Sequence, residues 1–210
     1  GCIEQTFIKI NQKQKKIIKI LERGSSHILF QNKILGEEHK LFSYDKYPID
    51  PRIIEKELRE YELADYIVVP SEFAKRSFLE NGIKDEKLIK IPYGVDLSEF
   101  YKNNMNNNKF TIICVGSVSF RKGSYYLLKA FKELNLPDSK LIFAGTINPE
   151  IKNIIKPYLK ENNITFIGHV SQNKLNKIYN EASISVICSI EEGLAMVQAQ
   201  AMASGIPLIC

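Results

Sequence analysis

The chain has 210 residues, of which 44% are hydrophobic and 25% charged, and its formal net charge is +5. These values are typical of an ordinary globular protein and exclude the disordered and fibrous classes. No apolar stretch reaches the roughly 18 residues that a membrane span needs, and the N-terminus lacks the plan of a signal peptide, so we expect a cytoplasmic protein.

The first half predicts an irregular series of strands and helices. Apolar runs bounded by turn residues predict strands, and apolar positions three and four residues apart predict helices. Asp50 followed by Pro51, and Ser71, are expected to cap two of the helices. The strands are predicted over 15–21, 65–70 and 87–94, and the helices over 25–42, 50–64 and 72–82.

The second half predicts strands and helices in strict alternation. Strands apolar on both faces, separated by helices, indicate a parallel, doubly wound sheet of the α/β class. We expect Ser171 to cap one helix, and Gly205 with Pro207 to close the last. The strands are predicted over 109–117, 140–145, 164–168, 184–189 and 207–210, and the helices over 122–134, 149–159, 172–182 and 194–204.

A polar stretch without periodicity separates the two halves. It predicts a linker over 102–108, between an N-terminal domain over 1–101 and a C-terminal domain over 109–210. The sequence has no initiator methionine, and its last predicted strand has nothing after it to cover it. We therefore expect both domains to be incomplete in this chain.

The cysteines and histidines do not form a recognisable metal site. The cysteines have no CxxC spacing and two of them lie in apolar runs, which predicts buried free thiols at Cys114 and Cys188. The histidines also lack the helical spacing of metal ligands, which disfavours zinc. The other residues of these two types are Cys2, Cys210, His27, His39 and His169.

The loop "GSVSFRKG" over 116–123 follows the first strand of the second half and enters a helix. It matches neither the dinucleotide fingerprint nor the phosphate loop, which disfavours a dinucleotide-dependent oxidoreductase. Arg121 and Lys122 lie close to a helix N-terminus, where positive charge is unfavourable unless an anion is shared. The alternative interpretation is a solvated basic turn.

The stretch "SIEEGLAMVQAQAMASGIP" over 189–207 places polar residues on an apolar helix. Glu191 and Glu192 suit a helix start, so a simple cap is one interpretation. Gln198 and Gln200 need a hydrogen-bond partner or a cleft, because an unsatisfied buried amide costs about 1 to 3 kcal/mol. The sequence has no Gly-x-Ser-x-Gly elbow and no carboxylates spaced like a glycosidase pair, which disfavours hydrolases.

Four segments, in order, resemble one family. "ADYIVVPSEFAKRSF" (64–78) and "IPYGVDLSEF" (91–100) are similar to stretches near its domain junction. "VGSVSFRKGSYYLLKAF" (115–131) resembles the start of its C-terminal domain, and "EEGLAMVQAQAMASGIP" (191–207) resembles its paired-glutamate motif. The family is the retaining GT-B glycosyltransferases of family 4, also called the glycosyl transferases group 1.

The resemblance implies two Rossmann-like domains and a donor site in the C-terminal one. Arg121 and Lys122 would hold the donor diphosphate, with Gly116 and Ser117 at the start of the same loop. Glu192 would be a catalytic residue at the donor sugar. Lys122 would also be catalytic, at the leaving group. The remaining residues that the resemblance assigns to substrate binding are Gly193 and Leu194, through their backbone N–H groups.

Three further residues complete the predicted site. Gln200 stands where the family has its second glutamate, which grips the ribose, and a neutral amide there weakens that bond. His27 lies near the place of a family histidine beside the sugar, and Arg23 is a weaker candidate for substrate binding. The alternative interpretation of this region is a helix start capped by Ser25 or Ser26.

The implied activity is a hexosyl-type transfer from a nucleotide sugar, such as a UDP- or GDP-sugar, to a glycan or lipid-linked acceptor with retained configuration. It implies no cofactor and no metal, and suits polysaccharide or glycolipid assembly. The scattered lysines disfavour nucleic acid as a partner, whereas the positive charge leaves an anionic membrane face open. The alternative is a truncated or inactive module that binds a nucleotide sugar without transferring it.

Overall fold

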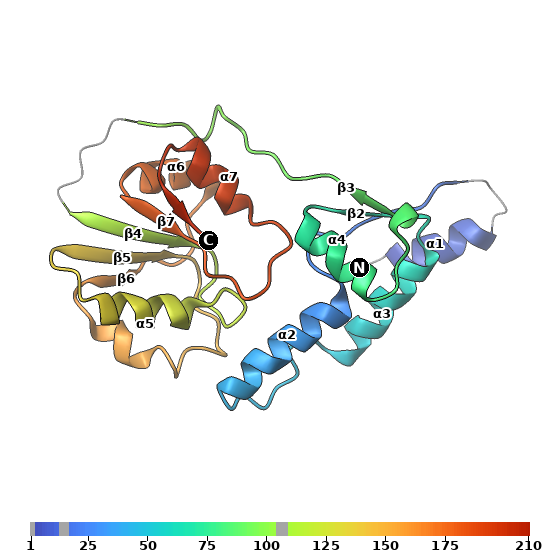
Figure 1. Cartoon of the computed structure of the whole chain (residues 1–210), viewed down its shortest axis with the longest axis horizontal. Helices are drawn as coiled ribbons and strands as arrows, with labels where there is room; N and C mark the ends of the chain where they lie inside the picture. The colour runs from blue at the N-terminus through green and yellow to red at the C-terminus, as the bar shows by residue number, and fades with distance from the viewer. Residues whose placement is uncertain (1–2, 13–16, 104–108) are drawn as a thin grey trace. The chain divides into compact units, whose positions relative to one another are not determined.

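The computed structural model describes residues 3–12, 17–103 and 109–210, which fold into two compact α/β units (Figure 1). The first unit takes the chain up to Tyr93 together with Glu191–Leu194. The second takes Gly94–Ile190 and Ala195–Cys210. Each unit has its own parallel sheet, which confirms the predicted α/β class.

The first unit has a three-stranded parallel sheet in the order β1-β2-β3. Leu21 of β1 pairs with Ile67 of β2, which in turn pairs with Leu88 of β3. The elements are α1 (Ile3–Gln12), β1 (Ile20–Glu22), α2 (Ile28–Leu41), α3 (Pro51–Leu63), β2 (Tyr66–Val69), α4 (Glu72–Glu80), the 3-10 turn η1 (Asp85–Lys87) and β3 (Leu88–Lys90).

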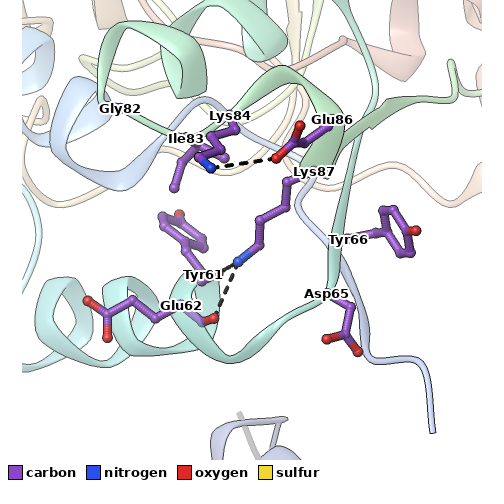
Figure 2. A pocket seen from close by; sticks show the side chains of 9 residues that line it. All are labelled: Tyr61, Glu62, Asp65, Tyr66, Gly82, Ile83, Lys84, Glu86 and Lys87. Atoms are coloured by element: carbon purple, nitrogen blue, oxygen red, sulfur yellow. Dashed lines mark hydrogen bonds and ion pairs between the residues drawn. The ribbon is translucent and has the colours of Figure 1, made fainter. Parts of the chain in front are cut away.

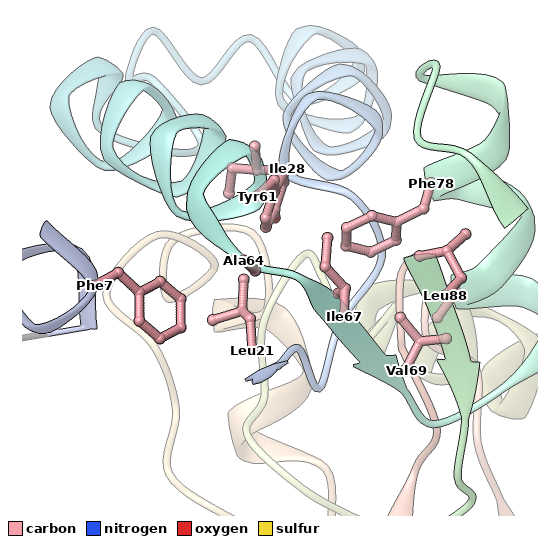
Figure 3. Close-up of a cluster of buried hydrophobic side chains, with 10 residues drawn as sticks. Phe7, Leu21, Ile28, Tyr61, Ala64, Ile67, Val69, Phe78 and Leu88 are labelled. Carbon is pink, nitrogen blue, oxygen red and sulfur yellow. The ribbon is translucent and has the colours of Figure 1, made fainter. Parts of the chain in front are cut away.

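An aromatic and aliphatic core holds this unit together (Figure 3). Ile67 and Val69 of the central strand are fully buried, and Phe78 of α4 and Tyr61 of α3 pack edge to face 5.0 Å apart. Phe7 brings α1, a helix that was not predicted, onto the same core. Burial of large side chains such as these is the main favourable term for a sheet of only three short strands.

Two predicted helix caps of the first unit are confirmed. Asp50 accepts a hydrogen bond from the Arg52 backbone N–H at 2.9 Å, directly before Pro51, and Ser71 accepts one from Ala74 at 3.1 Å. The alternative interpretation, in which Ser25 or Ser26 caps α2, is wrong in its residue, because His27 is the capping residue.

The first predicted strand is shorter than expected. It begins at Ile20, where its partner β2 begins at Tyr66, although the apolar run starts several residues earlier. Residues 15 and 16 of the predicted strand lie outside the described part of the chain. Pairing with a neighbour, which a single stretch of sequence does not reveal, decides where such a strand starts.

The second unit has a five-stranded parallel sheet, as the alternation predicted, and its strand order is β6-β5-β4-β7-β8. In Figure 1, α6 and α7 cover one face of the sheet and α5 the other. The elements are β4 (Phe110–Val115), α5 (Ser124–Leu134), β5 (Ser139–Ala144), the 3-10 turn η2 (Lys156–Lys160), β6 (Ile164–Phe166), α6 (Gln172–Asn180), β7 (Ile184–Val186), α7 (Met196–Ala203) and β8 (Leu208–Ile209).

Two details of the second unit differ from prediction. The helix expected over 149–159 is a series of turns followed by η2. Pro157 accounts for this, because a proline disfavours helical geometry at the preceding residue and removes a backbone donor. Ser171 stands at the N-cap of α6, but its hydroxyl hydrogen bonds to the Asn173 side chain and caps no backbone N–H.

The boundary between the units comes earlier than predicted, after Tyr93. The Asp96 side chain accepts hydrogen bonds from the Ser98 backbone and hydroxyl at 2.8 and 2.7 Å, which forms a tight turn. This turn delivers Phe100, which is 1% exposed, into the core of the second unit against Tyr179. The region therefore packs as part of that unit, and residues 104–108 of the predicted linker lie outside the described part of the chain.

Candidate functional site

The loop over 116–123 lies at the carboxyl end of β4, the central strand of the second unit. It is held by hydrogen bonds of its own side chains: Ser119 accepts from the Lys122 backbone N–H, and Ser124 accepts from the Ser119 backbone N–H, both at 3.2 Å. The Phe120 backbone N–H donates to Glu150 at 3.1 Å. A loop so fixed presents its backbone groups in one arrangement, which is what a preorganised binding site requires.

Three predicted residues of this loop lie together. Gly116, Ser117 and Lys122 line one small pocket at the carboxyl ends of β4 and β7. The Lys122 side chain runs beside Gly116, because a Cβ added to that glycine would lie 3.7 Å from the Lys122 Cε. Carboxyl ends of parallel strands are where such sheets bind ligands, so the fold places this cation at a suitable position for an anion.

Two cysteines line the same pocket. Cys114 is a buried free thiol, as predicted, whereas Cys188 is only half-buried. The Cys188 thiol donates to the Lys122 carbonyl at 3.2 Å and to the Gly123 carbonyl at 3.4 Å. Cys188 therefore helps to hold the loop through these two hydrogen bonds. Cys2 lies outside the described residues.

Gln200 is a buried residue of α7 in the second unit. Its side chain is 5% exposed, and its carbonyl oxygen accepts a hydrogen bond from the Tyr179 hydroxyl at 3.3 Å. The buried amide thus has a hydrogen-bond partner inside the unit, as buried polar groups require. The hydrogen bond joins α7 to α6, and the contact of Gln200 with a ribose stays a prediction. Gln198 is half-buried.

Arg121, in the same loop as Lys122, is half-buried, and its carbonyl accepts a hydrogen bond from the Ile190 backbone N–H at 2.8 Å. The predicted residues not yet described lie in the first unit, where segment 191–194 packs against the loop between β1 and α2. A Cβ added to Gly193 would lie 2.0 Å from the Gly24 carbonyl oxygen, so only glycine fits. The Ser71 hydroxyl donates to the Gly193 carbonyl. Glu192 and Leu194, on either side, are half-buried.

Glu191 is the residue of this segment whose role the sequence did not reveal. It is 1% exposed and lies five residues before the first residue of α7, so it is not the helix cap that we predicted. The Ser26 backbone and hydroxyl donate to one of its oxygens at 3.1 and 2.6 Å, and the Gln31 amide donates to the other at 2.7 Å. A charge in so dry a place is tolerated only with such donors.

Arg23 belongs to the same polar network. Its guanidinium donates to the Gln31 carbonyl oxygen at 3.1 Å and pairs with Glu57 at 3.1 Å, and both charged side chains are 18% exposed. Glu57 also accepts from the Tyr61 hydroxyl at 2.8 Å. Arg23 is thus held by protein groups, and we assign it to this network.

Tyr93 is a second residue that the sequence reasoning missed. Its hydroxyl lies over Gly24, since a Cβ added there would meet it at 2.6 Å. Burial raises the pKa of Tyr93, and Glu22 and Glu192 add to the effect, which places Glu192 within electrostatic reach. The signal was present in the motif "IPYGVD", where the resembled family has asparagine at the tyrosine position.

His27 faces the core of the first unit. It is 2% exposed, its Nδ1 accepts a hydrogen bond from the Leu29 backbone N–H at 3.2 Å, and its ring packs 4.9 Å from Tyr61 and 5.0 Å from Phe78. Its own backbone N–H donates to the Ser77 hydroxyl. His27 thus caps α2 and packs in the core, which gives it a structural role, and its contact with a sugar stays a prediction.

The acid stability of the first unit should depend on His27. Burial, followed by the charge of Arg23, lowers the pKa of His27 from 6.5 to about 4. The unfolded chain binds the proton more tightly, so the stabilisation is complete above pH 6.5 and lost as pH falls towards 4. We expect that loss to reach about 3 kcal/mol. Urea unfolding at pH 7 and pH 4 should show it in the wild type and not in His27→Asn, which keeps a capping oxygen; parallel pH profiles would contradict the assignment.

A second pocket, of about 560 Å³, lies in the first unit, at one end of its three-stranded sheet (Figure 2). It is lined by residues at the amino ends of β2 and β3, where parallel sheets rarely bind ligands. Lys87 spans it and donates to the carbonyls of Tyr61 at 2.5 Å and Glu62 at 3.3 Å, which caps the end of α3. These contacts account for Lys87 as a structural residue.

The fold is that of the GT-B glycosyltransferases. It resembles a sucrose-phosphate synthase from Thermosynechococcus elongatus with a TM-score of 0.73 and 21% identity, covering 98% of this chain and 52% of that one. It also resembles HepE from Anabaena, solved in complex with UDP and glucose, with a TM-score of 0.66 and 16% identity, covering 99% and 63%.

The family follows from the sequence match. The family model of the glycosyl transferases group 1 matches residues 97–210, and the chain belongs to that family. An uncharacterized glycosyltransferase from Haemophilus influenzae is 26% identical over 223 residues, which cover 99% of this chain and 62% of that protein. The chain spans about half the length of the curated relatives that it matches.

None of the helices in 3–12, 17–103 and 109–210 combines the length and the apolar character that crossing a bilayer requires.

Proposed function

We propose that the protein is a retaining glycosyltransferase of family 4, which moves a hexosyl group from a nucleotide sugar to a glycan or lipid-linked acceptor without a metal ion or other cofactor. The observation that carries the proposal is the position of Lys122 within the family-matched region. It lines one pocket with Gly116 and Ser117, at the carboxyl end of the central strand. The proposed substrate is anionic, because Lys122 offers a positive charge where parallel sheets bind ligands.

In the proposed reaction, Lys122 and Arg121 neutralise the diphosphate of the donor. Negative charge grows on that group as the bond to the sugar breaks, and fixed cations in a preorganised loop stabilise it most at that moment. Gly116 and Ser117 allow the nucleotide to approach the backbone closely. The loop hydrogen bonds of Ser119 and Ser124 hold this arrangement before the donor arrives.

Glu192 is proposed to contact the donor sugar, with the backbone N–H groups of Gly193 and Leu194 close to it. The support is local: Gly193 is held between Gly24 and Ser71, which fixes the backbone next to the Glu192 side chain. HepE has been solved with UDP, so UDP-sugars are the first donors to test.

Calorimetric titration tests the proposal. The full product of the gene is titrated with UDP, GDP and ADP and with their sugars. We expect one nucleotide to bind, and its sugar to bind more tightly than the nucleotide alone. Glu192→Ala should remove the advantage of the sugar and leave nucleotide binding intact. Absence of binding by every nucleotide and nucleotide sugar would contradict the proposal.

A further inference from the structure

We propose that Glu191 is a positioning residue for the transfer reaction, which holds the loop between β1 and α2 against the segment that carries Glu192. The inference rests on the proposed function, because it concerns the placement of a residue proposed to contact the sugar. It assigns separate roles to two adjacent glutamates, one to the sugar and one to the protein.

The contacts of Glu191 are long-range and divided between two elements. One oxygen accepts two hydrogen bonds from Ser26, in the loop before α2, and the other accepts one from Gln31, in the first turns of α2. Because each oxygen has different donors, the carboxylate cannot rotate or shift without losing a bond. It therefore fixes the orientation of its own segment as well as its distance from the loop.

The neighbouring contacts reinforce the same alignment. Gly193 lies against the Gly24 carbonyl and its own carbonyl accepts from the Ser71 hydroxyl. Gln31 is in turn held by Arg23, which pairs with Glu57 of α3. Glu192 thus stands between two residues whose positions are fixed, and a displacement of Glu191 would move it.

A buried carboxylate contributes little to the stability of a protein by itself. Replacing a buried charge and its partners by apolar residues of similar volume is often neutral or stabilising in proteins. Such networks are better suited to specifying one arrangement of the groups that they join. Glu192 is the next residue in the chain after Glu191, so fixing Glu191 also fixes the residue that is proposed to contact the sugar.

An exchange of two side chains tests the proposal. Glu191→Gln places one amide nitrogen opposite another, either at Ser26 or at Gln31, and breaks the network. The double variant Glu191→Gln with Gln31→Glu restores a donor for each acceptor, because the new carboxylate accepts from both residue 191 and Arg23. Ser26→Ala removes only the hydroxyl bond and keeps the backbone one.

The readouts are release of UDP from UDP-sugars, affinity for UDP alone and melting temperature. We expect Glu191→Gln to lower the turnover number by about 10- to 100-fold, the effect of misplacing a reacting group by about 1 Å. Its affinity for UDP alone should stay within about two-fold of wild type, since a positioning role does not alter the cationic loop. Ser26→Ala should show a smaller loss, and the double variant should recover most of the turnover.

Three results would overturn the proposal. If wild type turns over the donor and Glu191→Gln matches it, the positioning role alone fails. The positioning role also fails if the loss of turnover in Glu191→Gln is matched by a lower melting temperature and the double variant does not recover the turnover. If the wild-type protein releases no nucleotide from any donor, the proposed function fails and the positioning role with it.

Discussion

Replacing Lys122 with methionine is expected to lower the turnover of a nucleotide sugar by about 100- to 1,000-fold, the usual effect of removing one preorganised group that stabilises developing charge. Methionine keeps most of the volume and the unbranched shape of lysine, so the pocket with Gly116 and Ser117 should remain filled. The loop is held by side chains of Ser119 and Ser124, which the substitution leaves in place.

Lys129→Met is the matched control. Lys129 lies on α5, its side chain is 57% exposed and it forms a surface pair with Glu133, so its loss should change neither turnover nor stability measurably. Initial rates of nucleotide release, with melting temperatures of all three proteins, provide the measurement. Equal rates for Lys122→Met and wild type would remove Lys122 from the reaction.

Replacing Gly123 with alanine is expected to destabilise the second unit by about 2 to 5 kcal/mol. Gly123 has φ of 62°, which costs a residue with a Cβ about 1 to 2 kcal/mol. The added Cβ would also lie 1.9 Å from the Cys188 carbonyl oxygen, and forcing such a contact costs about 1 to 3 kcal/mol more. The oxygen belongs to the backbone and the Cβ is attached directly to it, so neither can turn aside as the end of a flexible side chain would.

Gly94→Ala serves as the control for Gly123→Ala. A Cβ at Gly94 would meet nothing within 4 Å, and this glycine has no positive φ. Urea unfolding should therefore show a shifted midpoint for Gly123→Ala and an unchanged one for Gly94→Ala. A Gly123→Ala protein as stable as wild type would contradict the described loop geometry.

Much of the fold was predictable because its causes are local. The apolar runs at β4 and β5 and the caps at Asp50 and Ser71 are read from neighbouring residues. The errors arose where distant partners decide the outcome. β1 starts where β2 can pair with it, and the residues before Phe100 belong to the second unit because that ring enters its core.

The candidate site divides in the same way. The sequence placed Gly116, Ser117 and Lys122 together because one loop carries them all. It could not show that Tyr179 supplies the partner of Gln200, since no pattern links α6 to α7 at those positions. Nor could it find the bond between Glu191 and Ser26, which lie 165 residues apart in the chain. A polar residue in an apolar stretch indicates that a hydrogen-bond partner is needed, but it does not indicate which residue supplies it.

Nuclear magnetic resonance of donor hydrolysis tests the central claim most directly. The full product of the gene is mixed with a UDP-sugar, and the first-formed sugar is observed before its anomers interconvert. The account predicts release of UDP, the same anomeric configuration in product and donor, and little release by Lys122→Met. Release with inverted configuration would contradict the retaining mechanism, and absence of release from any nucleotide sugar would contradict the proposed function itself.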